Sequence, residues 1–173
     1  MSRKVWIAIA AAVLVAVAVI AFVATGGRHD DGTPAEQLSS WVTGTGLGQD
    51  LGVLHQDNKD VDEVLSHHRG TGAMHTVCSV LSVTAESAHS NLPTPDTQTT
   101  QLLARAYTLE YEAGNDCYDA GVTGTALLKR SAEDRAEAQH IVDEALSRVE
   151  AVTGATVSTT TTTQPTAGTG IFG

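Results

Sequence analysis

Two cysteines on either side of a double-proline turn constrain the fold of this chain more than any other feature. Cys78 and Cys117 flank the sequence Leu92–Asp96, which contains Pro93 and Pro95. Proline ends a helix because it lacks an amide donor and disfavours helical backbone in the residue before it. The cysteines lie on opposite sides of this turn, on helices that run antiparallel, so the two side chains can face each other in a hairpin. We therefore predict a helical hairpin closed by a Cys78–Cys117 disulfide, with two buried free thiols as the alternative.

Apolar residues recur at alternating steps of three and four through most of the chain, which is typical of helices packed in a bundle. We expect one helix over residues 35–66, a second carrying Met74 to Leu92, a third over 97–119 and a fourth over 125–152. The predicted buried stripes are Leu38, Trp41, Leu51, Leu54, Val61 and Leu65; Met74, Cys78, Leu81, Ala85, Ala88 and Leu92; Leu103, Ala106, Glu110, Ala113 and Cys117; and Leu128, Ala138, Val142, Ala145, Val149 and Val152. The chain is thus predicted to be all-α, with residues 35–152 forming a disulfide-stapled, up-down four-helix bundle.

Local signals refine the helix boundaries. Thr33 before Pro34 is typical of a helix N-cap, and Asp96 or Thr97 can cap the third helix. The glycine-rich run 44–48 predicts a kink or break in the first helix, because glycine in a helix interior costs about 1 kcal/mol relative to alanine. This run lacks the Lys-Ser/Thr ending of a phosphate-binding loop and does not follow a strand, so we do not expect it to bind phosphate. On the outer face of the fourth helix, Glu144 and Arg148 are spaced for an ion pair.

The N-terminal part predicts a membrane anchor. Residues 5–24 are uninterrupted apolar residues, and about 20 residues at ~1.5 Å each span the ~30 Å of a bilayer core. Arg3 and Lys4 precede this run, which places residues 1–4 in the cytoplasm and the rest of the chain outside the cytoplasmic membrane. Residues 25–34 then form a linker. The alternative is a cleaved signal peptide and a secreted protein, for which Ala24–Gly26 offers a cleavage site.

The predicted export of the chain bears on the state of its two cysteines and on the partners that its net charge allows. Two cysteines in an oxidising compartment usually pair, which favours the disulfide. The formal net charge is −10, and it becomes −12 outside the membrane once Arg3 and Lys4 are removed. An acidic surface repels phosphate backbones, so nucleic acid is not an expected partner. Residues 153–173 are rich in threonine and are predicted to be a disordered tail, either unmodified or O-glycosylated.

Two Glu-x-x-His pairs suggest a metal site, because inward-facing pairs of this kind hold the metals of di-iron bundles. Glu86 and His89 fall one step beyond the buried stripe of the second helix, however, and Glu137 and His140 lie opposite that of the fourth. Other acidic candidates are Asp62 and Glu63. We predict solvent-exposed pairs and no metal site.

Histidines near the turn before the second helix give no better case. His68 and His75 are about two helical turns apart, ~10 Å, which is too far to chelate one ion without a third element. His67 is the third histidine there, and a pH-sensitive contact through these side chains stays open. No nucleophile–base arrangement has local support, and no cation lies beside Cys117 to activate it. We therefore expect no catalytic residues, no cofactor and no enzymatic activity.

Glu110 is the exception among the charged residues, because it shares the buried stripe with Cys117. A carboxylate there must be paired, hydrogen-bonded or close to the rim of the bundle. The rim, or a partner such as a tyrosine or Arg105, is the interpretation that the sequence favours.

The segment around the double-proline turn resembles a known family. The residues that carry the resemblance are Leu92–Asp96, Ala106-Tyr107, Tyr111–Gly114, Cys117 and the upstream Cys78-x-x-Leu81, and it covers roughly Trp41 to Gly121. The family consists of small membrane- or lipid-anchored exported helical proteins of actinomycete-type bacteria. Many of its members have a lipidation cysteine, which this sequence lacks. The resemblance implies the single disulfide and a transmembrane anchor in place of the lipid, and it implies no particular activity.

The sequence thus predicts a non-catalytic envelope protein. Residues 5–24 would anchor it in the cell membrane, and the helical domain would have a structural role or bind another envelope protein. The alternative is a helical bundle that binds a metal or small ligand through Glu110.

Overall fold

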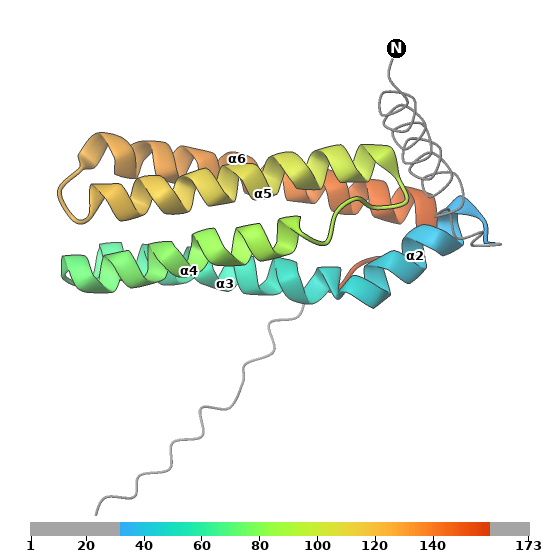
Figure 1. The fold of residues 1–173 in the computed structure, drawn as a ribbon, viewed down its shortest axis with the longest axis horizontal. Helices are drawn as coiled ribbons and strands as arrows, with labels where there is room; N and C mark the ends of the chain where they lie inside the picture. The colour runs from blue at the N-terminus through green and yellow to red at the C-terminus, as the bar shows by residue number, and fades with distance from the viewer. Residues whose placement is uncertain (1–31, 160–173) are drawn as a thin grey trace, which may run out of the picture. The chain divides into compact units, whose positions relative to one another are not determined.

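The computed structural model describes residues 32–159, and this part of the chain is entirely helical (Figure 1). Its five helices are α2 (Pro34–Thr45), α3 (Leu47–Ser66), α4 (Thr71–His89), α5 (Thr97–Ala120) and α6 (Thr125–Thr153). The all-α prediction is confirmed for these residues. The helix predicted over residues 35–66 is divided into α2 and α3 at Gly46, whose φ of 71° lies in the left-handed region that favours glycine.

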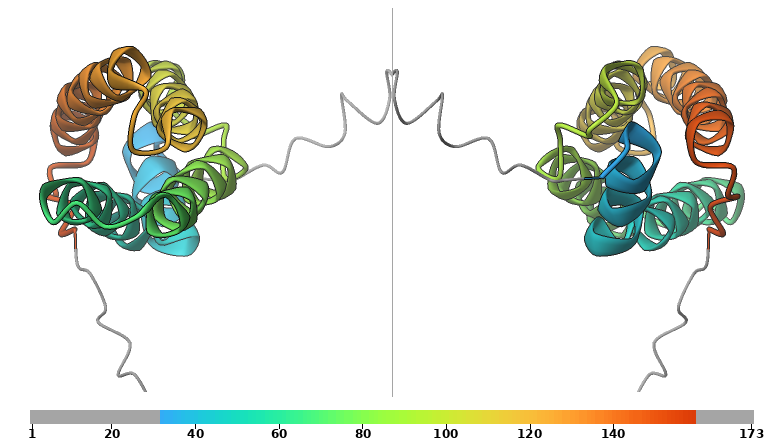
Figure 2. Two further views of the ribbon diagram at one scale, coloured as in Figure 1. Left: turned by 90° about the vertical axis from the view of Figure 1, so that its left-hand side faces the viewer. Right: turned by 90° about the vertical axis from the view of Figure 1, so that its right-hand side faces the viewer.

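Helices α3 to α6 form the predicted up-down bundle. Each of them runs antiparallel to the next, and the connecting turns alternate between the two ends of the bundle (Figures 1 and 2). Helix α2 packs mainly against α6 and buries Leu38 completely. Its Trp41 donates a hydrogen bond from Nε1 to the carbonyl of Asn91 at 3.3 Å, and the Asn91 amide donates to Asp50 at 2.8 Å. Asn91 therefore ties the loop after α4 to the bend between α2 and α3.

The predicted stripes form the core. The side chains of the stripe on α4 are buried from Met74 to Ala88, and the stripe on α5 is buried throughout. On α6 the stripe is buried from Ala138 to Val149, whereas Leu128 and Val152 are half-buried at its ends. The step pattern therefore identified the inner faces of all four long helices.

The Cys78–Cys117 disulfide is present, and it is part of this core. It joins α4 to α5 with a Cα–Cα distance of 5.6 Å, and both residues are fully buried. One turn from Cys117, Gly114 faces α4 so closely that an added Cβ would lie 2.3 Å from Ser82 Oγ and 2.9 Å from the Cys78 carbonyl. Glycine at this position therefore permits the close approach of α4 and α5.

The two predicted helix caps are present, whereas one predicted ion pair is not. The Thr33 hydroxyl accepts from Glu36 N at 3.3 Å, and Asp96 caps α5 by accepting from Thr99 N at 2.8 Å. The prediction of a Glu144–Arg148 ion pair was wrong. Arg148 instead donates from Nη2 to Asp96 at 2.8 Å, because Asp96 at the start of α5 offers a fixed, partly buried carboxylate. This contact lowers the pKa of Asp96 strongly.

Several predictions fall wholly or partly outside the described residues. The membrane anchor over residues 5–24 and the ends 1–4 and 160–173 lie there. Within residues 32–159, no helix is both long and apolar enough to cross a membrane. Thr153 is the last residue of α6, and residues 155–159 continue without helix or strand. This segment returns to α3, where an added Cβ on Gly48 would lie 2.4 Å from the Ser158 carbonyl.

Candidate functional site

The side of the bundle between α3 and α6 differs from the other three sides. Helix α3 packs on α4, α4 on α5, and α5 on α6, whereas the backbones of α3 and α6 hardly approach each other (Figure 2). Polar side chains bridge α3 and α6 instead. This side holds the buried ionisable groups of the candidate site, which are Asp57 on α3, Glu110 on α5 and Arg135 on α6.

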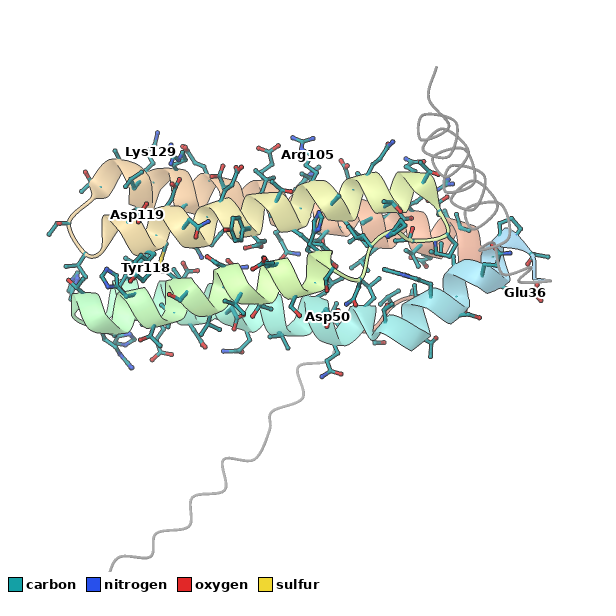
Figure 3. The ribbon with its side chains drawn as sticks, in the orientation of Figure 1. Glu36, Asp50, Arg105, Tyr118, Asp119 and Lys129 are labelled. Atoms are coloured by element: carbon teal, nitrogen blue, oxygen red, sulfur yellow. A yellow bond between two sulfur atoms is a disulfide. The ribbon has the colours of Figure 1, made fainter. Side chains whose placement is uncertain are left out.

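Glu110 is the centre of this group. Glu110 is only 4% exposed, and Asn58 Nδ2 donates a hydrogen bond to its Oε1 at 2.9 Å. Glu110 is thus hydrogen-bonded inside the bundle and does not lie at the rim. Arg105, the partner that the sequence suggested, points away from the bundle on the outer face of α5 (Figure 3) and pairs with Glu137. The favoured interpretation of Glu110 was therefore wrong.

Arg135 connects α6 to α3. Its Nη1 donates to the Asn58 carbonyl at 3.2 Å, and its Nη2 donates to Asp62 at 2.8 Å. The Arg135 side chain is 10% exposed and that of Asp62 is 67% exposed, so the ion pair runs from the interior to the surface. Asn58 therefore contacts both the buried carboxyl of Glu110 and the buried guanidinium.

Three buried side-chain atoms in the described part of the chain have no hydrogen-bond partner there, and all three belong to this group. They are Asp57 Oδ2, Glu110 Oε2 and Arg135 Nε. An unpartnered buried polar atom costs about 1–3 kcal/mol, so each one in a folded protein calls for an explanation, such as a bound partner or a functional role. Their occurrence in one place marks the group as a site with unused hydrogen-bonding capacity.

Burial raises the pKa of Glu110 to about 7, because the low-dielectric interior disfavours the carboxylate. Asn58 and the positive charge of Arg135 oppose this shift, and the negative charge of Asp57 adds to it. Burial also raises the pKa of Asp57, an effect that Thr84 on α4 partly offsets. Glu110 therefore changes protonation near neutral pH, in contrast to an exposed glutamate.

A cleft of about 190 Å³ opens above Glu110 between α3 and α6. Glu110 lies in its wall. The other lining residues are Leu51, Leu54, His55 and Asn58 of α3; Gln139, Val142, Asp143 and Leu146 of α6; and Thr159 of the segment after α6. Four of these lining residues are apolar and the others are polar, and Glu110 is the buried carboxyl among them. Such a mixed wall can contact both a polar group and a short apolar segment of a small molecule.

Other hollows of the described surface fit a site less well. A hollow of about 330 Å³ lies between α2, α3, the end of α6 and residues 155–158, but no ionisable side chain lines it. A surface hollow of about 210 Å³ between α4 and α5 contains Glu86 and His89 beside Tyr107 and Tyr111. Both Glu86 and His89 are exposed, and none of the unpartnered buried polar atoms of residues 32–159 belongs to a residue that lines that hollow.

The residues considered for a metal are dispersed. Glu86 and His89 on α4 and Glu137 and His140 on α6 are exposed, as their phase predicts. In residues 32–159, no three His, Cys, Asp or Glu side chains are grouped to hold a metal ion. Asp62 pairs with Arg135, and Glu63 pairs with Arg69 at 2.6 Å.

The histidines at the turn before α4 also have separate surroundings. His67 lies within 2.9 Å of the Glu63 carbonyl, and His68 is exposed at the turn with a φ of 50°. His75 stacks on Tyr118 of α5 with ring centroids 4.2 Å apart.

Sequence reasoning identified Glu110 and missed Asp57 and Arg135. The spacing of residues could have identified both, because Asp57 lies three residues after Leu54 and four before Val61. Arg135 likewise lies three residues before Ala138. Both polar residues therefore continue the predicted buried stripes, which were drawn through apolar residues only.

Comparison of the chain with known protein families, with curated proteins and with solved structures finds no match.

Proposed function

We propose that this protein is a non-catalytic, membrane-anchored helical domain that binds a small molecule in the cleft above Glu110. The observation that carries the binding role is the Glu110 carboxyl, which is 4% exposed, lines the cleft and has an unpartnered Oε2. A bound hydrogen-bond donor would satisfy this acceptor. The surrounding leucines and valine would remove an apolar part of the ligand from water.

The location of the domain is part of the proposal and rests on the sequence. Residues 5–24 would anchor the chain with its N-terminus in the cytoplasm, as in the family of exported helical proteins that the sequence resembles. The disulfide supports an oxidising compartment. The alternative is release after signal cleavage.

The predicted topology has a direct test in native membranes. We expect the intact mass of the isolated protein to include residues 1–24, and protease added outside the cell to reach residues 25–173 only. A mature chain that begins after residue 24 would replace the anchor by a cleaved signal peptide.

Binding in the cleft has its own test, which uses the full chain with labelled leucine and valine methyl groups. In a nuclear magnetic resonance screen of small polar fragments, we expect the fragments that bind to shift the signals of Leu51, Leu54, Val142 and Leu146. The variant Leu146→Trp should abolish these shifts, because the larger half-buried side chain fills the cleft.

The matched control is Val83→Trp, which places the same side chain at a position on α4 that is 65% exposed. It should leave the fragment shifts unchanged. Circular dichroism verifies that both variants fold. A screen in which no fragment moves the four signals, or in which Leu146→Trp binds as the wild type does, would refute the binding role.

A role in binding another envelope protein is the second candidate. Val83, Tyr111 and Tyr118 are exposed and line one surface hollow between α4 and α5, which favours an interaction there. Photo-crosslinking from position 111 in intact cells tests it, and capture of no envelope protein would remove this candidate.

A further inference from the structure

The charges of the cleft select the kind of ligand that it accepts. Glu110 and Asp143 are the carboxyl groups in its lining, and no lysine or arginine lines it. Arg135 is nearby, but its Nη1 and Nη2 donate to Asn58 and Asp62 of α3. His55 of α3 is the basic side chain in the wall. An anion in the cleft would therefore meet two carboxyl groups and no lysine or arginine, whereas a cation would meet favourable charge.

The acidic side chains around Glu110 outnumber the basic ones. Asp57 and Glu110 are buried, Asp62 is exposed, and Arg135 is the cation among them. Arg135 is already engaged with Asp62 at 2.8 Å. A positively charged donor at Glu110 Oε2 would compensate the remaining charge and supply the absent hydrogen bond.

The rest of the cleft sets the size and the apolar character of the ligand. Leu51 and Leu54 on α3 face Val142 and Leu146 on α6 across the cleft. A volume of about 190 Å³ lies below the ~300–1,000 Å³ of typical ligand pockets, so the cleft admits only a small ligand. A short hydrocarbon chain with one charged end matches both properties.

We propose, building on the ligand-binding role above, that the ligand is a short aliphatic amine. Its ammonium group donates to Glu110 Oε2 while Asn58 holds Oε1, and its hydrocarbon chain lies between the leucines of α3 and Val142 of α6. An amine with a second ammonium group reaches Asp143. Binding of the ammonium group requires the Glu110 carboxylate, so the affinity rises as the pH rises through neutrality.

Calorimetric titration of the full chain at pH 8 tests the ligand class. The probes are n-butylamine and 1,4-diaminobutane, and the matched controls are 1-butanol and butyrate, which have the same hydrocarbon chain without a positive charge. We expect the amines to bind at least tenfold more tightly than 1-butanol, and butyrate not to bind. The affinity for n-butylamine should fall at least tenfold between pH 8 and pH 5.

Two variants connect the affinity to Glu110. Glu110→Gln keeps the size and the acceptor for Asn58 but removes the charge, so it should weaken amine binding at least tenfold. Glu112→Gln removes a carboxylate from an exposed position on the same helix and should leave the affinity unchanged. Equal amine binding to Glu110→Gln and wild type would overturn the inference, because attraction by the acidic surface would then explain it.

The two proposals fail in different ways. If 1-butanol binds as tightly as n-butylamine and Leu146→Trp abolishes both, the cleft is a ligand site and the amine assignment is wrong. If neither amine binds, the amine assignment is also wrong, and the fragment screen decides the binding role independently.

Discussion

Reduction of the Cys78–Cys117 disulfide is expected to lower the free energy of unfolding by about 4 kcal/mol. The crosslink joins residues 39 positions apart, and closing a loop of this length in the unfolded chain gives about 4 kcal/mol in the chain-entropy model. This is a large share of the ~5–15 kcal/mol that stabilises a typical domain. Urea unfolding of the oxidised and reduced protein, followed by circular dichroism, measures the difference.

The control for this experiment is the double variant Cys78→Ala/Cys117→Ala. Its stability should equal that of the reduced protein, apart from the packing lost with two fully buried sulfur atoms, and reducing agent should leave it unchanged. Coincident unfolding curves of the oxidised and reduced wild type would show that the disulfide does not stabilise the bundle.

Glu110→Gln is expected to stabilise the protein at alkaline pH by about 3 kcal/mol relative to wild type. The pKa of Glu110 is raised from its ordinary 4.5 to about 7 in the folded state. The wild type therefore has its full stability below about pH 4.5 and loses part of it as the pH rises through 7, by about 1.4 kcal/mol for each pH unit between the two values. Glutamine does not titrate, and its side-chain oxygen still accepts from Asn58.

The stability difference between variant and wild type, measured by urea unfolding from pH 4 to pH 9, isolates this effect. Other groups near Glu110 are Asp57 and His55 on α3 and Arg135 and Asp143 on α6, and they are common to both proteins. Glu112→Gln should show no such pH-dependent gain, because its carboxylate is exposed. A difference between Glu110→Gln and wild type that is independent of pH would contradict the buried, neutral carboxyl.

The sequence predicted the bundle well because each step of its construction is local. The alternation of three and four residues fixes which face of a helix is buried, and prolines and glycines fix where helices end. The disulfide followed from the turn at Pro93 and from the phase of both cysteines. The break at Gly46 was also predictable, because a left-handed residue there needs glycine.

The partners of the buried charges were not predictable in the same way. Periodicity places Glu110, Asp57 and Arg135 on inner faces, but it does not say which residue of a distant helix lies opposite. Asn58 and Glu110 are 52 positions apart, and Arg135 and Asp62 are 73 apart. Such pairs depend on how far each helix is shifted along the bundle axis and on its rotation about its own axis. The same applies to Arg148, whose local partner Glu144 is replaced by Asp96 across the bundle.

The unequal joining of the four long helices has a consequence for how the bundle moves. On one side, a covalent bond and the close approach at Gly114 fasten α4 to α5. On the other side, α3 and α6 are connected largely by side chains such as Arg135. Local separation of helices is therefore expected to cost less free energy on the α3–α6 side than on the disulfide side. We therefore expect amide hydrogen exchange to be faster in α3 and α6 around Glu110 than in α4 and α5 around Cys78 and Cys117.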